Sequence, residues 1–281
     1  FTGLVEGNYI PLIRSSVSNI IQHGGTMLKS ARTPEFHTPE CRKKAYESMK
    51  AAGMDGLVVI GGDGTARAAA ALDSEFDIPV VGCAATIDND LSGTDDTIGF
   101  DTAVNTALES IDKIRDTADA FERTFYIEVM GRDSGFIALN VGLSCGAEYI
   151  AIPETQTTVE SILKIFHNQR ANKRSNMIVV AEGDETGGAI KLAEEVKKHT
   201  GIDYRVTILG HVQRGGSPTA RDRILASKAG GAAVRALLDG KRGVMVGEQK
   251  GEVTYTPFLD AANTKKSIDN KLVELARILA M

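Results

Sequence analysis

Two aspartates separated by a single residue, Asp88 and Asp90, follow an apolar run over residues 78–85. A short run of this kind indicates a buried strand, and ligands of open α/β sheets bind outside the carboxyl ends of the strands. Carboxylates at that position could hold a cation and accept a proton. An Asx turn, in which an aspartate caps the following helix, explains the same residues. The pair taken alone therefore leaves a reaction centre and a simple turn as alternatives.

A glycine-rich turn, Gly61-Gly-Asp-Gly-Thr65, lies between an apolar run over 56–60 and an alanine-rich segment over 66–72. Strand, glycine turn and helix in this order can bind a phosphate, because glycines let the backbone approach the anion and the first N–H groups of the helix face it. Many glycine turns only reverse the chain. The turn adds Asp63 to the candidate residues, and by itself it is weak evidence for a phosphate.

Polar side chains also follow three other strand-like runs. Arg132, Glu182 and His211 each come shortly after such a run, and Arg214 lies three residues beyond the last of them. Carboxylates, glycine turns and arginines at strand ends fit a magnesium-dependent transfer between two phosphorylated molecules, which needs positioning, a cation over the phosphates and a base. Magnesium takes one or two protein carboxylates together with phosphate oxygens. The planar guanidinium of arginine suits the phosphate of a sugar.

The elements that must position these residues alternate along the chain. Helical stretches lie between the strand-like runs, and this alternation predicts doubly wound parallel sheets. The length of 281 residues exceeds one typical core. The predicted fold class is therefore α/β, with two doubly wound, Rossmann-like parallel-sheet domains. The predicted helices cover residues 39–54, 66–72, 136–143, 158–172, 189–198 and 218–238, and residues 15–22 also carry apolar side chains at helical spacing.

Composition argues against several functional classes. Hydrophobic residues make up 42% and charged residues 25% of the chain, as in ordinary soluble domains. The formal net charge of −5 argues against a general nucleic-acid surface, while a local basic pocket for phosphates is compatible with it. No apolar run approaches the roughly 20 residues that span a bilayer. The widely spaced Cys41, Cys83 and Cys145 indicate reduced packing residues, and we expect a cytoplasmic protein.

Five motifs occur in order along nearly the whole chain. They are Gly61-Gly-Asp-Gly-Thr65, Thr86-Ile-Asp-Asn-Asp90, Thr97-Ile-Gly-Phe-Asp-Thr-Ala103, Glu128-Val-Met-Gly-Arg132 and Gly210-His-Val-Gln-Arg-Gly-Gly-Ser-Pro218. Together they resemble the 6-phosphofructokinase family, and five in that family's order are specific where one would not be. The resemblance implies transfer of the γ-phosphate of ATP to the 1-hydroxyl of fructose 6-phosphate in glycolysis, giving fructose 1,6-bisphosphate and ADP. It also implies Mg²⁺ and an allosteric homotetramer whose active sites are shared between subunits.

The resemblance implies a role for each matching residue at the reaction centre. Asp88 would be the base that takes the proton from the 1-hydroxyl of the sugar, with Thr86 beside it. Asp63 and Asp90 would organise Mg²⁺. Arg132 would stabilise the charge of the phosphoryl group during transfer. The predicted catalytic residues are therefore Asp88, Arg132 and Thr86, and the predicted metal ligands are Asp63 and Asp90.

The remaining roles that the resemblance implies concern the two substrates. Arg32, Gly64 and Thr65, together with Asp63, would contact the phosphates of the nucleotide. The predicted sugar-phosphate residues are Thr86, Asp88, Met130, Gly131, Arg132, Glu182, His211 and Arg214, joined by Arg123 and Arg205 from a neighbouring subunit.

Several of these residues also have a simpler explanation. Arg123 could be an ordinary surface arginine, Glu182 could cap a turn, and His211 could be satisfied within a loop. The motif context favours a functional role for Glu182, His211 and Arg132, whereas Met130 is mainly a packing residue.

The resemblance also predicts the domain organisation. Residues 1–99 plus 211–262 would form the nucleotide-binding domain and residues 100–210 plus 263–281 the sugar-phosphate-binding domain, with the active site in the cleft between them. The family opens with a strand and a Gly-Gly-Asp loop that nothing here matches, and Phe1 aligns just after them. We therefore expect the amino-terminal part of the first domain to be missing. The residues that match the family's effector site are Arg115, Glu148 and Lys173.

Other functions remain alternatives. A non-catalytic sugar-phosphate-binding regulatory subunit would be favoured by loss of the base or the metal carboxylates, and Asp63, Asp88 and Asp90 are present. A nicotinamide or lipid kinase would explain only the glycine turn. Pyrophosphate-dependent members of the family resemble one another in carrying Asp at the position of Gly64 and Lys at that of Ala85. Gly64 leaves room for the α-phosphate and lets the backbone approach it, so ATP is the expected donor.

Overall fold

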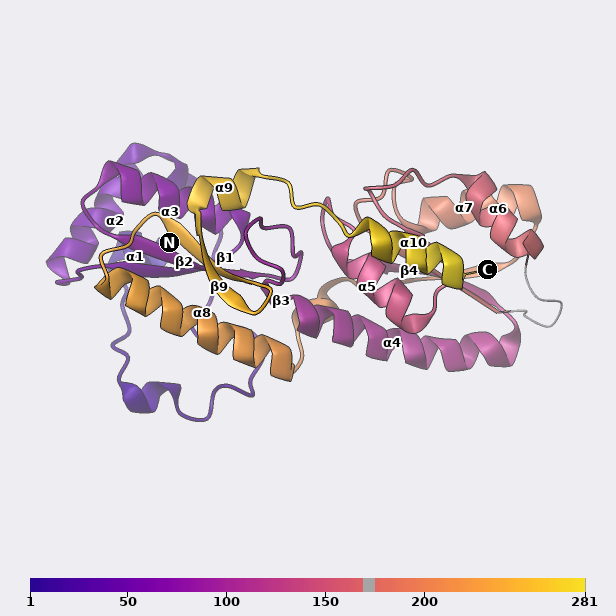
Figure 1. The fold of residues 1–281 in the computed structure, drawn as a ribbon, viewed down its shortest axis with the longest axis horizontal. Coiled ribbons are helices and arrows are strands. Elements are labelled where there is room, and N and C mark those ends of the chain that lie inside the picture. Colours follow the sequence, from indigo (N-terminus) through magenta and orange to yellow (C-terminus); the bar gives the residue numbers. More distant parts are fainter. Residues whose placement is uncertain (169–174, 281) are drawn as a thin grey trace. The chain divides into compact units, whose positions relative to one another are not determined.

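The computed structural model describes residues 1–168 and 175–280, which form two compact units (Figure 1). Unit 1 comprises Phe1–Thr86, Leu91–Gly99 and Ser217–Lys266. Unit 2 comprises Ile87–Asp90, Phe100–Gly216 and Ser267–Met281. Each unit has its own mainly parallel sheet with helices, which confirms the predicted α/β class.

Unit 1 is built on a five-stranded sheet of order β1-β2-β8-β9, in which β3 also pairs with β2. The first strands are parallel, and β9 runs antiparallel to β8. The strands are β1 (Leu57–Gly61), β2 (Val80–Thr86), β3 (Ile98–Gly99), β8 (Val244–Gln249) and β9 (Glu252–Pro257). The helices are α1 (Thr2–Glu6), α2 (Pro39–Ala51), α3 (Asp63–Glu75), α8 (Ala220–Leu238) and α9 (Phe258–Asn263), with 3₁₀ turns at Arg14–Val17 and Pro34–His37.

Strand β2 is buried on both faces over Val80–Ala84, and its sequence is apolar up to Ala85. Val80 and Ala84 belong to the core cluster that also contains Ala66, Ala69 and Leu72 of α3. Val81 and Cys83 belong to a second cluster, formed with Ala229, Ala233 and Ala236 of α8. Successive residues of a strand point to opposite faces of the sheet, so α3 and α8 cover opposite faces. The carboxyl end of β2 is thereby fixed from both sides.

Unit 2 contains a four-stranded, fully parallel sheet of order β5-β6-β4-β7. Ile127 and Val129 of β4 pack in the cluster that includes α4 and α5, and Tyr126 packs in the cluster that includes α7. Helices therefore cover both faces here too. The strands are β4 (Thr124–Val129), β5 (Tyr149–Ala151), β6 (Asn176–Ala181) and β7 (Tyr204–Ile208). The helices are α4 (Phe100–Phe121), α5 (Phe136–Cys145), α6 (Val159–Asn168), α7 (Ala189–Thr200) and α10 (Asn270–Leu279), with a 3₁₀ turn at Gly210–Arg214.

The unit boundaries differ from the expected domain boundaries in three places. Residues 87–90 and 211–216 belong to unit 2, and residues 263–266 belong to unit 1. For residues 87–90 the reason is local packing, because Ile87 lies against the core of unit 2. Asp88 and Asp90 are thus part of unit 2, although the strand that leads to them belongs to unit 1. Within the segment predicted as helix 158–172, residues 169–172 lie outside the described part.

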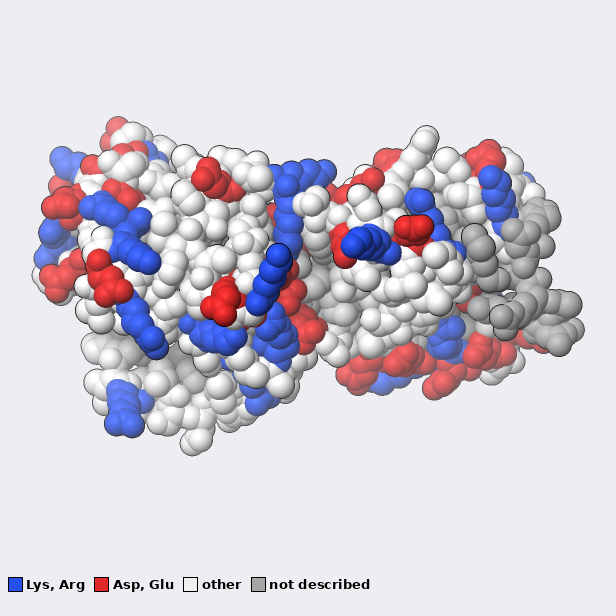
Figure 2. Space-filling model, viewed as in Figure 1, with Lys and Arg blue, Asp and Glu red and all other residues white. Residues whose placement is uncertain are grey.

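On the face shown in Figure 2, acidic and basic side chains are intermixed over unit 1.

No helix in the described part of the chain combines the length and the apolar character that crossing a membrane requires.

A buried carboxylate ties β8 to α8 within unit 1. Glu248 is only 2% exposed, and its two oxygens lie 2.7 Å from Lys228 Nζ and 2.8 Å from Arg221 Nη1. Arg221 also pairs with Asp96 at 3.1 Å. The hydrogen bond from Lys228 is the main cause that lowers the pKa of Glu248, with Arg221 contributing and burial opposing. The carboxylate is therefore ionised and paired at neutral pH.

We expect Glu248→Gln to lower the free energy of unfolding by about 2 kcal/mol near neutral pH, because charge-assisted hydrogen bonds are lost. The folded-state pKa lies below the unfolded value of about 4.3. The contribution is therefore present above that pH and disappears as the pH falls through the folded-state pKa. Urea unfolding of both proteins at stepwise lower pH measures the difference. The exposed pair of Glu109 and Lys113 provides the control Glu109→Gln, which should change stability far less. A Glu248→Gln difference that is independent of pH would contradict this account.

Candidate active site

The carboxyl ends of the strands in unit 2 form one edge of its sheet, because all four strands are parallel. Met130 and Arg132 follow β4, Glu182 follows β6, and His211 follows β7 after a short turn. Arg132, His211 and Arg214 are exposed or half-exposed there. The structure therefore gathers at one edge the residues that the sequence placed at separate strand ends. Such an edge is where open α/β sheets bind ligands.

The turn after β4, residues 130–135, is held by side chains that follow the other three strands of the sheet. Gln213, on the loop after β7, accepts the Met130 N–H at 2.9 Å. One carboxylate oxygen of Glu182 accepts the N–H groups of Gly131 at 3.3 Å and of Arg132 at 2.8 Å. Glu154, after β5, accepts the Gly135 N–H at 3.0 Å. Glu182, predicted as a sugar-phosphate ligand, thus also shapes the turn that carries Arg132.

Arg132 adopts a left-handed backbone conformation, with φ of 52°. Such a conformation costs a non-glycine residue about 1–2 kcal/mol, and it persists where the surroundings over-determine it. The side-chain bonds to the turn supply that support. Gly183 is equally constrained, because an added Cβ would lie 2.0 Å from the Arg132 carbonyl oxygen. The backbone position from which the Arg132 side chain projects is therefore fixed by contacts within unit 2.

Asp88 lies beside this turn with its side chain 7% exposed, and its Oδ2 is 3.6 Å from Nε of Arg132. The arginine side chain is 53% exposed, so its remaining N–H groups can face a bound anion. Asn89 takes a left-handed conformation with φ of 54°, which asparagine tolerates better than most residues. A nearly buried carboxylate next to a half-exposed guanidinium can accept a proton from a hydroxyl while the cation stabilises developing negative charge.

The glycine turn of unit 1 joins β1 to the amino end of α3. A Cβ added to Gly61 would lie 2.2 Å from Oγ1 of Thr65, so only glycine lets the first helical turn pack this closely. A Cβ on Gly64 would meet no described heavy atom within 4 Å. The space beside Gly64 is thus open, at the positive end of a helix 13 residues long. This geometry can accept an anion such as a nucleotide phosphate.

Asp63 is the first residue of α3, and its Oδ2 lies 2.6 Å from Nη1 of Arg67. The Asp63 side chain is 30% exposed, so the carboxylate is accessible to a cation as well as to the arginine. Among the described residues no group of three or more His, Cys, Asp and Glu side chains forms a cluster. Mg²⁺ does not need such a cluster, since it takes one or two carboxylates and completes its shell with water and phosphate. Asp63 in unit 1 and Asp90 in unit 2 are donors of the right kind.

Thr86 and Arg32 lie in different parts of unit 1. Thr86 ends β2, and its carbonyl accepts the Thr97 hydroxyl at 2.6 Å. This bond and the pairing of Thr86 with Gly99 close the base of the loop that contains Asp88. Arg32 is exposed just before the 3₁₀ turn at Pro34–His37.

Arg123 and Arg205 lie at the opposite end of the sheet of unit 2 from Arg132. Arg123 precedes β4, and Arg205 pairs with Phe125 near the start of β7. The six residues of β4 separate Arg123 from the turn, a distance of about 20 Å at roughly 3.3 Å per residue. Arg123 and Arg205 therefore belong to a different surface from the edge that carries Arg132 and Glu182.

The predicted effector residues have structural partners in unit 2. Arg115 donates from Nη2 to the Cys145 carbonyl. Glu148 is 3% exposed, and its Oε2 accepts the Met177 N–H of β6. Lys173 lies outside the described residues.

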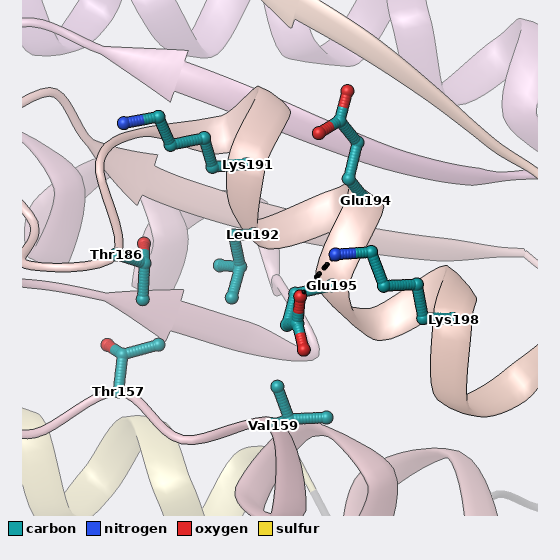
Figure 3. A pocket seen from close by; sticks show the side chains of 8 residues that line it. All are labelled: Thr157, Val159, Thr186, Lys191, Leu192, Glu194, Glu195 and Lys198. Carbon is teal, nitrogen blue, oxygen red and sulfur yellow. Dashed lines mark hydrogen bonds and ion pairs between the residues drawn. The ribbon is translucent and has the colours of Figure 1, made fainter.

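A separate cavity of about 400 Å³ lies between the segment before α6 and helix α7 (Figure 3). Two lysines and two glutamates are among its lining residues, and Lys198 pairs with Glu195 at 2.8 Å. None of the residues that the sequence singled out lines it. The balanced charge indicates no ligand class.

Three residues that hold the site were not found from the sequence. The side chains of Ser134, Glu154 and Gln213 each form a hydrogen bond with a backbone atom of the turn after β4. Gln213 stands between His211 and Arg214, inside a motif that the sequence singled out, and that position was the only available signal. Contacts between a side chain and a distant backbone group leave no pattern in residue spacing.

Comparisons with known proteins agree on one family. The family model described as "Phosphofructokinase" matches residues 1–237. The chain is 55% identical to "ATP-dependent 6-phosphofructokinase 1" of Thermus thermophilus, covering 100% of this chain and 88% of that protein. It is 50% identical to "ATP-dependent 6-phosphofructokinase 2" of Bacteroides thetaiotaomicron, covering 100% of this chain and 87% of that protein. The solved structure of phosphofructokinase from Saccharomyces cerevisiae matches with a TM-score of 0.89 and 30% identity, over all of this chain and 42% of that one.

Proposed function

The chain belongs to the phosphofructokinase family, and on that premise we propose that it phosphorylates fructose 6-phosphate at the 1-hydroxyl with the γ-phosphate of ATP. The products are fructose 1,6-bisphosphate and ADP, and the reaction is a step of glycolysis. The observation that carries the proposal is the nearly buried Asp88 carboxylate 3.6 Å from the half-exposed Arg132 guanidinium. Phosphoryl transfer needs this combination of a base for the attacking hydroxyl and positive charge for the transferring group.

Each side of the reaction has its own proposed residues. Asp88, with Thr86 beside it, takes the proton of the sugar hydroxyl, and Arg132 stabilises the charge of the phosphoryl group. Arg32, Asp63, Gly64 and Thr65 bind the nucleotide, which makes unit 1 the nucleotide-binding part. Unit 2 is the sugar-phosphate part, whose proposed ligands are Met130, Gly131, Arg132, Glu182, His211 and Arg214.

Mg²⁺ is the proposed metal, held by Asp63 and Asp90. Both are oxygen donors, as this cation prefers. When bound, the cation neutralises charge on the phosphates of ATP. Arg67 already pairs with Asp63, so binding of the cation would loosen or replace that ion pair.

Arg123 and Arg205 are proposed to serve the sugar site of a neighbouring subunit. Their place at the far end of the sheet supports this, because side chains about 20 Å from the Arg132 turn cannot reach a ligand held there. Arg123 stacks on Phe121, with its guanidinium carbon 4.6 Å from the ring centroid. We propose a cytoplasmic homotetramer in which adjacent subunits complete each other's sites.

The donor is tested by comparing ATP with pyrophosphate at equal Mg²⁺, in wild type and in Gly64→Asp. The substitution should not disturb the fold, since its Cβ would meet no described atom within 4 Å. We expect wild type to use ATP, and Gly64→Asp to lose at least about tenfold in kcat/KM for ATP through bulk and like-charge repulsion. Gly231→Asp on α8 is the matched control, because Gly231 is equally unobstructed among the described residues. Faster turnover of wild type with pyrophosphate would overturn the donor assignment.

A further inference from the structure

Ser134 connects the turn that carries Arg132 to the segment that carries Asp88. Ser134 is only 6% exposed. Oγ lies 3.1 Å from the main-chain oxygen of Asp88 and 2.9 Å from that of Gly131. One hydroxyl has a single proton, so the two carbonyls share it or receive it in turn. The hydroxyl is thus placed between the two backbone segments of the candidate site.

The shape of the turn itself does not depend on this hydroxyl. The Ser134 N–H donates to the Gly131 carbonyl at 3.1 Å, which closes the turn through the backbone. Glu182 holds the N–H groups of Gly131 and Arg132. Removing the Oγ atom therefore leaves the backbone bond of the turn and its Glu182 contacts in place, and removes the side-chain bonds of Ser134 to Gly131 and Asp88.

The residues around Asp88 explain why a hydrogen bond to its main-chain oxygen would help to fix the position of its backbone. The next residue, Asn89, is in the left-handed region, and two residues further Leu91 belongs to the core of unit 1. The ion pair between Asp88 and Arg132 is long, at 3.6 Å, and is too loose to fix the carboxylate on its own. A hydrogen bond at the Asp88 carbonyl fixes the backbone from which that carboxylate projects.

We propose that Ser134 is a positioning residue, which holds the Asp88 main chain on the Arg132 turn so that base and guanidinium keep one geometry. This rests on the proposed roles of Asp88 and Arg132. A positioning residue acts on the chemical step and not on substrate affinity, since a small displacement of a catalytic group raises the barrier without removing ligand contacts.

The test is a double-mutant cycle between Ser134→Ala and Asp88→Asn, with kcat and KM measured for both substrates. We expect Ser134→Ala to lower kcat about tenfold and to leave both KM values within about twofold. In the Asp88→Asn background the same change should have almost no further effect, because the base it positions is already absent. Equal losses in both backgrounds would mean a general structural role and would overturn the proposal.

Two comparisons keep the outcome interpretable. Ser134→Thr retains the hydroxyl, and valine in Ser134→Val has the shape of threonine without the hydroxyl. A higher kcat for the threonine variant than for the valine variant therefore reports the hydroxyl, even if the alanine variant folds poorly. Equal rates for this pair would also refute the role. Ser110→Ala, which removes a hydroxyl bonded to the Thr106 carbonyl on α4, is the control and should match wild type. A wild type with no fructose 6-phosphate kinase activity would refute the proposed function first, whereas an active wild type with a fully active Ser134→Ala would refute only the role of Ser134.

Discussion

Asp88→Ser is expected to lower kcat by about 10²–10⁴-fold, the usual contribution of a positioned base. KM values should change little, because the serine removes a group needed in the transition state and leaves the surrounding contacts in place. The nearly complete burial of Asp88 beside Arg132 is the physical reason for expecting an effect this large. Steady-state rates with both substrates varied give the two parameters.

The control for this substitution is Asp112→Ser, at an exposed position of α4 in the same unit. It removes the same charge from unit 2 and should leave kcat unchanged. Near-normal turnover of Asp88→Ser would show that another group takes the proton.

Arg132→Ala is expected to lower kcat by about 10³-fold or more, as does the loss of an arginine that stabilises a transferring phosphoryl group. Glu182 accepts backbone N–H groups of the turn, which alanine keeps, so the bonds between the turn and Glu182 are retained. Arg132→Lys should recover part of the rate, because it restores the charge but not the planar fork.

Arg277→Ala, at an exposed position of α10, is the control for loss of one cation from unit 2. An Arg132→Ala protein with raised KM for fructose 6-phosphate and unchanged kcat would limit Arg132 to ground-state binding. That outcome would remove it from the catalytic step.

Strands β2, β4 and β6 could be predicted because buried parallel strands are mainly apolar. The runs before Asp88, Arg132 and Glu182 correspond to β2, β4 and β6. Apolar spacing over residues 15–22 was a poorer guide, since only a 3₁₀ turn at Arg14–Val17 forms there. Val17 and Ile21 are 51% and 58% exposed. A short amphipathic segment without a core to pack on does not gain enough to form a stable helix.

The candidate site could be predicted at the level of residue type and strand end, and not at the level of contacts. Parallel pairing brings Arg132, Glu182 and His211 to one edge, which follows from strand order alone. The contacts of Ser134 and Gln213 with backbone atoms depend on tertiary packing that residue spacing does not encode. The same holds for the assignment of residues 87–90 to unit 2, since the packing of Ile87 decides it.

Transfer of the γ-phosphate from ATP to the sugar can be followed by ³¹P NMR of the purified protein with ATP, Mg²⁺ and fructose 6-phosphate. We expect the γ-phosphate resonance of ATP to disappear while ADP and a second phosphomonoester, on the sugar 1-oxygen, appear in equal amounts. Under the same conditions the Asp88→Ser protein should show this conversion only far more slowly. Persistence of ATP and fructose 6-phosphate with the wild-type protein, or conversion only when pyrophosphate replaces ATP, would show that the protein does not transfer the γ-phosphate of ATP to this sugar.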